Sequence, residues 1–184
     1  MANFSWSSHV NFIVNRARRL VGLLYRKFYE HSSSQTLLKL YCSFIRPHLE
    51  YASVVWFPYL VKDRAAIEKV QYFALRVCLK DWSLGYDEAL DRAHLPSLIT
   101  RRDRAGLCYM YNIVHSNMDF ESAPVEPRTV SRFTRHSNRY QLQQFSCHYN
   151  AFMNSFPKTI STWNSLPEEV LASPSLAIFK RAIN

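Results

Sequence analysis

The apolar residues near the start of the chain recur at the spacing of one face of an α-helix. From Val10 to Phe28 they follow steps of three and four, which predicts a helix over about Ser8–Tyr29. The apolar face consists of Val10, Ile13, Val14, Ala17, Leu20, Val21, Leu24 and Phe28. A helix with such a face needs an apolar partner. Similar spacing recurs later, and only three of the 184 residues are glycine, so we expect an all-α, mainly helical protein.

Further helices are expected at several places along the chain. A second one contains Leu37, Leu38, Tyr41, Phe44 and Ile45, and a third runs from Arg64 to about Lys80 with Asp63 as its N-cap. Shorter or later helices are expected at Asp87–Ala93, after Pro96, before Trp163, and after Ser175, which would cap the last one. The patterns divide the chain into a helical bundle at 1–117, a basic linker at 118–150 rich in Pro, Ser and Thr, and a helical C-terminal segment at 151–184.

The positive charge lies mainly in the first third of the chain. The formal net charge is +9, and residues 1–62 carry eight Lys or Arg but only the acids Glu30 and Glu50. This balance favours a polyanionic partner, with nucleic acid ahead of a membrane surface. Two groups of cations have helical spacing. Around the helix axis, the first group covers an arc of about 100° and the second an arc of about 40°. The first is Arg16, Arg19, Arg26 and Lys27, and the second is Lys69, Arg76 and Lys80. Each is interpreted either as a solvated face or as a row of phosphate contacts.

The segment Phe44–Trp56 combines charged residues, a proline and apolar residues, and it predicts a corner between two helices. Pro47 would begin the second helix, where its missing N–H costs nothing. Arg46, Pro47, His48, Glu50 and Trp56 are the structural residues of this corner, with Arg46, His48 and Glu50 satisfying one another and the backbone. We expect Phe44, Leu49, Val54, Val55 and Trp56 to be buried around them. Farther on, Arg101, Arg102 and Arg104 either pair with carboxylates such as Asp87, Glu88 or Asp91 or face an anion, and we expect the pairing.

No pattern in the sequence predicts catalysis, a metal or a cofactor. There is no Phe/Tyr-x-Asp-Asp box, no glycine-rich phosphate loop and no nucleophile elbow. The four cysteines lie 30 or more residues apart, which does not fit zinc ligation. No secretory signal or membrane-spanning run is found, and we expect an intracellular protein, nuclear or cytoplasmic, with no small-molecule substrate.

Taken together, several ordered motifs resemble the region that follows the catalytic palm in non-LTR retrotransposon reverse transcriptases of the LINE or jockey type. The motifs are Trp6-Ser7-Ser8-His9-Val10, Leu40-Tyr41, the run from Ser43 to Trp56, Ile67-Glu68-Lys69-Val70-Gln71 with Ala74 and Arg76, Asn154-Ser155-Phe156, Trp163-Asn164-Ser165-Leu166-Pro167 and Phe179-Lys180. The resemblance covers nearly the whole chain. It implies a thumb-like bundle and the segment that follows the thumb.

The resemblance implies a role without catalysis, since the family's polymerase aspartates and endonuclease lie upstream of the motifs matched here. We expect a fragment of a reverse transcriptase that holds RNA or an RNA/DNA hybrid by its phosphates, and that is not an enzyme on its own. The alternative is an interaction module that docks on a palm domain or a sister chain, supported by the twelve Phe, eleven Tyr and four Trp. A degenerate reading frame with no function of its own is a further alternative.

Overall fold

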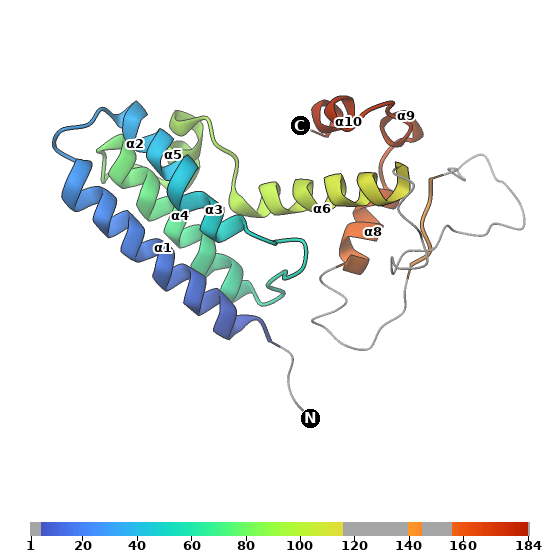
Figure 1. Cartoon of the computed structure of the whole chain (residues 1–184), viewed down its shortest axis with the longest axis horizontal. Helices are drawn as coiled ribbons and strands as arrows, with labels where there is room; N and C mark the ends of the chain where they lie inside the picture. The colour runs from blue at the N-terminus through green and yellow to red at the C-terminus, as the bar shows by residue number, and fades with distance from the viewer. Residues whose placement is uncertain (1–4, 116–139, 145–155, 184) are drawn as a thin grey trace, which may run out of the picture. The chain divides into compact units, whose positions relative to one another are not determined.

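The computed structural model describes residues 5–115, 140–144 and 156–183, and its regular structure is helical (Figure 1). These residues contain no β-strand, which confirms the expected all-α fold. The chain divides into two compact units, residues 1–102 and 103–184. The first unit is shorter than the bundle expected at 1–117, because most of one long helix, from residue 103 on, belongs with the C-terminal helices.

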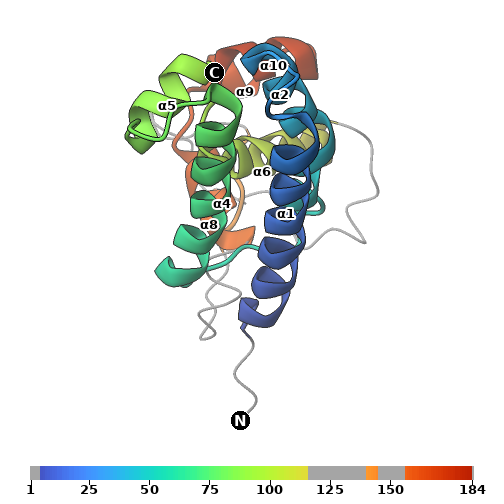
Figure 2. The same cartoon turned by 90° about the vertical axis from the view of Figure 1, so that its left-hand side faces the viewer.

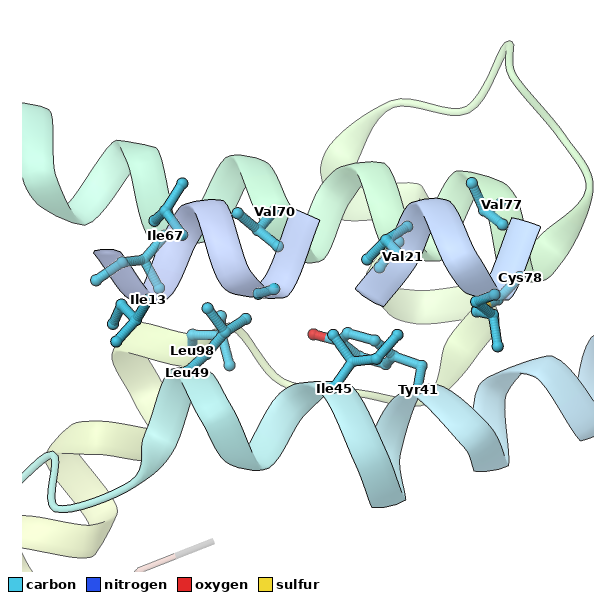
Figure 3. Packing of buried hydrophobic residues seen from close by; sticks show 14 of the residues in the cluster. Ile13, Val21, Tyr41, Ile45, Leu49, Ile67, Val70, Val77, Cys78 and Leu98 are labelled. Carbon is cyan, nitrogen blue, oxygen red and sulfur yellow. The ribbon is translucent and has the colours of Figure 1, made fainter. Parts of the chain in front are cut away.

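The first unit is built from helices of very different lengths. They are α1 (Ser7–Phe28), α2 (Ser34–Leu40), the π-helix η1 (Tyr41–Ile45), α3 (Arg46–Glu50), α4 (Val61–Leu79), α5 (Tyr86–Ala93) and the first turn of α6 (Leu98–His115). The helices α1 and α4 lie side by side and run in the same direction (Figure 2). The α2–η1–α3 segment packs against α1 and α4, and these helices share the main apolar core of the unit (Figure 3). A smaller cluster of Leu75, Leu84 and Ala89 lies beside it. Its fully buried members include Val10, Ala17, Val21, Leu37, Tyr41, Leu49, Val70, Ala74 and Val77.

Both ends of the α1–α4 pair are fixed by polar contacts. At the first end the Ser7 hydroxyl donates to the Asp63 carboxylate at 2.7 Å, and Asp63 is buried in the first turn of α4. The expectation that Asp63 caps this helix is therefore wrong: α4 begins two residues earlier, and the carboxylate bonds to α1 instead of its own backbone. At the other end the Lys80 ammonium lies 5.2 Å from the ring centroid of Tyr29.

The π-helix explains how a chain containing Pro47 continues as a helix. Leu37, Tyr41, Ile45 and Leu49 follow one another at steps of four, and all are buried. In a regular α-helix each such step advances by about 40°, so the last side chain would point about 120° away from the first. A π-turn holds more residues, and it turns the row back towards one side (Figure 3). Pro47 lies in the first turn of α3, as expected, but no corner precedes it, because the backbone is helical from Ser34 to Glu50.

Polar side chains of α4 connect this helix to the rest of the unit. The Tyr41 hydroxyl donates to Gln71 Oε1 at 2.9 Å, and Gln71 Nε2 donates to the Pro96 carbonyl at 3.1 Å. The Glu68 carboxylate accepts from the Ile99 amide at 2.7 Å and so caps the start of α6. Glu68 and Gln71 belong to the Ile67-Glu68-Lys69-Val70-Gln71 motif of the family resemblance, and their contacts give both residues a structural role.

The second unit has its own apolar core. It consists of the rest of α6 with α8 (Phe156–Asn164), α9 (Glu168–Leu171) and α10 (Leu176–Ala182). The core residues are Leu107, Met110, Tyr111, Ile113, Leu142, Ile160, Trp163, Leu171 and Phe179. Ser175 caps α10 by accepting from the Ile178 amide, as expected. Most of the expected linker at 118–150, with its four arginines, lies outside the described residues.

Part of the expected linker is nevertheless attached to this core. Asn164 bonds twice to Leu142: its Oδ1 accepts from the Leu142 amide and its Nδ2 donates to the Leu142 carbonyl, both at 2.9 Å. Trp163 Nε1 donates to the Tyr140 carbonyl at 2.9 Å. Residues 140–144 are therefore part of the C-terminal unit. The Trp163-Asn164 motif that carried part of the resemblance is the element that holds them.

Candidate nucleic-acid interface

The helix α1 carries a basic face with several exposed cations. Arg16, Arg19, Arg26 and Lys27 are all exposed, on the side of the helix away from its buried residues. None of the four forms an ion pair with any described residue. Cations with no intramolecular partner keep their charge available to an external anion. Arg18 is also exposed, but it lies about 100° from Arg19 around the helix and projects beside this row.

The second predicted row is not a set of three equivalent cations. Lys69 is exposed, whereas Arg76 is partly buried and its Nη2 donates to the Trp82 carbonyl. The Arg76 guanidinium also lies over the rings of Tyr72 and Trp82, at 5.3 Å and 5.1 Å from their centroids. Lys80 follows the end of α4 in a left-handed conformation with φ 57°. Arg76 and Lys80 are thus engaged with aromatic rings, and only Lys69 resembles the exposed cations of α1.

These contacts reveal a group of aromatic residues that the charge pattern did not indicate. Tyr25, Tyr29, Phe73 and Trp82 form what we call the aromatic cluster, at the C-terminal ends of α1 and α4. The ring centroids of Tyr25 and Tyr29 are 4.7 Å apart, and Trp82 lies 6.0 Å from Phe73 and 6.5 Å from Tyr25. Tyr25 and Trp82 are each 44% exposed, and Phe73 is 38% exposed. No local sequence pattern indicates the cluster, because its rings come from two helices that are distant in sequence.

The residues of the expected corner have structural partners, though not all the expected ones. Glu50 accepts from Arg101 Nε and from Arg101 Nη2, the latter at 3.0 Å, and it lies 3.8 Å from Arg46 Nε. Arg102 donates to the Leu49 carbonyl, and its guanidinium is 4.1 Å from the Trp56 ring centroid. The expectation that Arg101 and Arg102 pair with the acidic helix α5 is therefore wrong, because α3 lies closer to them in space.

Burial at this joint is also different from the expectation. Leu49 and Trp56 are buried, but Phe44 is 66% exposed and Val55 is 71% exposed, and Val54 is half-buried. Trp56 is held by its Nε1, which donates to the Tyr51 carbonyl at 2.8 Å. His48 makes no hydrogen bond to any described residue and is half-buried, while Pro47 is exposed.

Arg102 is the one strongly buried cation near this joint, and its surroundings do not favour a charge. Burial lowers the pKa of Arg102 to about 10, although Glu50 and Glu68 oppose that shift. Its Nε and Nη1 atoms are buried and have no hydrogen-bond partner within the described part of the chain. The side chain is 5% exposed, so it is inaccessible to a large ligand such as a nucleic-acid backbone. We interpret Arg102 as a residue that joins α6 to α3.

The described residues show neither a metal site nor a membrane-crossing helix. No three His, Cys, Asp or Glu side chains lie close enough to bind a metal ion within that part of the chain. In the same residues, no helix combines the length and the apolar character needed to cross a bilayer. Comparisons of the chain with protein-family models, with curated proteins and with solved structures found no match. The chemical character of the surface therefore carries the functional argument.

Proposed function

We propose that this chain binds nucleic acid through phosphate contacts made by the basic face of α1, as a non-catalytic fragment of a retrotransposon reverse transcriptase. The observation that carries the proposal is the row of exposed cations at Arg16, Arg19, Arg26 and Lys27, which form no ion pair with the described residues. Cations spaced along one helix face match the repeated phosphates of a nucleic-acid strand, and this type of contact needs no catalytic geometry. The partner is RNA or an RNA/DNA hybrid.

The position of α1 in the bundle also supports this proposal. Its opposite face is buried against α4, with Val10, Ala17 and Val21 fully buried, so the helix is fixed in the bundle. A fixed helix presents its cations without a large loss of backbone freedom on binding. Lys69 on α4 adds one further exposed cation to the proposed set.

The test compares two triple variants that remove the same charge. In the first, Arg16, Arg19 and Arg26 become Gln; in the control, the exposed Lys39, Lys62 and Arg181 become Gln. Binding of a 12-base-pair RNA/DNA hybrid is measured by fluorescence anisotropy at several salt concentrations. We expect the first variant to bind more weakly and to reduce the slope of log K against log salt by about 2 to 3. Equal effects of the two variants, or no binding at low salt, would contradict the proposal.

A second candidate function is docking on a palm domain or a sister chain. The observation in its favour is a set of exposed apolar side chains around the α3–α4 connection: Phe44, Tyr51 at 81%, Val55 and Val61 at 79%. Apolar side chains gathered in one stretch of sequence are more typical of a contact surface than of a solvated loop. Light scattering of the full chain over a range of concentrations tests this candidate. Association that disappears when Tyr51 and Val55 become Ser supports docking, and a constant monomer mass opposes self-association through this surface.

A further inference from the structure

The turn that carries Trp82 is held rigidly, although the indole itself is exposed. Asp81 Oδ1 accepts from the Ser83 amide at 3.0 Å and from the Ser83 hydroxyl at 2.7 Å. The other Asp81 oxygen pairs with Arg92 Nη1 at 3.0 Å. On the far side of the turn, the Tyr72 hydroxyl donates to the Leu84 carbonyl at 2.7 Å, and the Leu84 side chain is buried. The backbone on both sides of Trp82 is thus fixed, and the ring is presented in a defined position.

The neighbours of Trp82 enlarge this exposed ring into an aromatic surface. Tyr25 comes from α1 and Phe73 from α4, so helices distant in sequence contribute rings to one place. Arg76 lies against Trp82, which gives the apolar surface a positive neighbour. Large aromatic side chains that are well packed at their edges and open on part of their surface are suited to stacking against another flat ring.

The charge around the aromatic cluster favours an anionic ligand. The Lys80 ammonium lies 5.2 Å from the ring centroid of Tyr29, and Lys80 is exposed. Of the nearby acids, Asp81 pairs with Arg92 and Glu30 is exposed, while Asp87, Glu88 and Asp91 lie on α5, which also packs against α4. An apolar peptide would not require the cations, and a duplex presents its base faces only at its ends. Rings interleaved with cations fit a strand with free bases and regularly spaced phosphates.

We propose that the aromatic cluster binds an unpaired nucleotide of a single strand by stacking its base on Trp82, while the exposed Lys80 binds a neighbouring phosphate. The inference rests on the proposed nucleic-acid function and adds a preference for unpaired bases. Stacking uses the face that every base possesses, so RNA and DNA strands are both expected to bind. The double-helical part of a substrate would contact the basic face of α1 and not the aromatic cluster.

The test compares single-stranded oligomers with a duplex of the same length, using the full chain. The probes are a 12-nucleotide oligouridine, a 12-nucleotide oligothymidine and the blunt 12-base-pair hybrid. Trp82→Leu is expected to weaken binding of both single strands about 5- to 100-fold and to leave the hybrid nearly unchanged. Trp82→Phe is expected to restore most of the loss, because a phenyl ring still stacks. Circular dichroism checks that each variant is folded.

Tryptophan fluorescence of the unaltered chain gives a second readout that no substitution can disturb. Trp56 and Trp163 are buried and Trp6 is half-buried, so Trp82 is the most accessible of the four indoles. Single strands are expected to quench this emission more strongly than the hybrid does. Absence of quenching by either single strand would overturn the stacking proposal.

The remaining outcomes separate the stacking proposal from the proposed function. If Trp82→Leu weakens binding of the single strands and of the hybrid equally, or weakens neither, the stacking proposal is overturned. In that case the triple variant of Arg16, Arg19 and Arg26 still decides whether α1 binds phosphates. If Trp82→Leu acts on single strands alone and the triple variant has no effect on any probe, stacking stands and the role of α1 is overturned. No binding of any probe at low salt overturns both.

Discussion

At the scale of single residues, the Glu50 carboxylate connects segments that are far apart in the sequence. It joins α3 to the start of α6 through Arg101 and lies near Arg46. We expect Glu50→Ala to lower the free energy of unfolding by about 1–3 kcal/mol, because partly buried guanidinium groups lose their acceptor. Urea unfolding followed by circular dichroism measures this change, and Glu50→Gln, which keeps the shape, should cost less.

The same variant separates structure from binding at this residue. Since Glu50 holds the helix joint and does not face a phosphate in the proposed interface, Glu50→Ala should leave the salt dependence of hybrid binding unchanged. A changed salt slope with unaltered stability would assign the residue to the binding surface.

Cys78 provides a pH-dependent test of the buried core. Burial raises the pKa of the Cys78 thiol from its ordinary 9.0 to about 12. Between these values the unfolded thiol loses its proton while the folded thiol keeps it, so the folded state becomes less stable as pH rises above 9. The expected loss is up to about 1.4 kcal/mol per pH unit over this range, measured by urea unfolding from pH 8 to 11.

Cys78→Ala is the control for this pH dependence. It removes the titrating group, so the stability curve should be flatter between pH 9 and 10, even though the smaller side chain lowers stability at every pH. Burial also raises the pKa of the Tyr41 hydroxyl above its ordinary 10.0, and that group adds to the loss at higher pH. Parallel curves for the two proteins between pH 9 and 10 would show that Cys78 does not control the dependence.

At the scale of elements, α8 does more than fill the second core, because its last residue holds a distant segment. Asn164 supplies both a donor and an acceptor to Leu142, 22 positions away. We expect Asn164→Ala to release residues 140–144 from α8 and to increase hydrogen exchange at the Leu142 amide by roughly 5- to 100-fold, the range of about 1–3 kcal/mol for an unsatisfied buried group. Exchange within α6 is the internal control. Unchanged protection at Leu142 would show that burial of its side chain alone holds the segment.

Helix faces are the elements that the sequence predicted best, because their signal is local. The buried face of α1 and the Ser175 cap of α10 both follow from residues within a few positions of each other. The π-helix was missed, although a row of apolar residues at steps of four is visible around Tyr41 and Ile45. That spacing does not fit 3.6 residues per turn, and the π-helix could have been predicted from this mismatch.

At the scale of the whole molecule, contacts between distant residues could not be predicted from local patterns. Glu50 and Arg101 are 51 positions apart, and the nearer acids of α5 were the more obvious partners. The exposed cations of α1 could be predicted, since amphipathic spacing alone sets which side faces solvent. The aromatic cluster could not, because Tyr25 and Trp82 meet only after α1 and α4 have packed in parallel. The charged face could therefore be predicted from the sequence, whereas the aromatic cluster could be found only in the folded structure.

The π-turn at Tyr41–Ile45 implies that this segment could also form a regular helix if one of its residues were deleted. Deleting the exposed Ser43 would change the steps between Leu37, Tyr41, Ile45 and Leu49 from four, four, four to four, three, four, which an ordinary α-helix keeps on one face. The obstacle is Pro47, which would then lie inside a regular helix at a cost of about 3 kcal/mol.

We therefore expect the deletion alone to destabilise the chain, and the deletion combined with Pro47→Ala to regain most of the lost stability in urea unfolding. Pro47→Ala in the full-length chain should change stability much less. If the shortened chain gains nothing from Pro47→Ala, the π-turn does not compensate for the proline. If the shortened chain does gain stability from Pro47→Ala, the extra residue and the proline depend on each other. A change in the length of this segment is then tolerated only when the proline changes too.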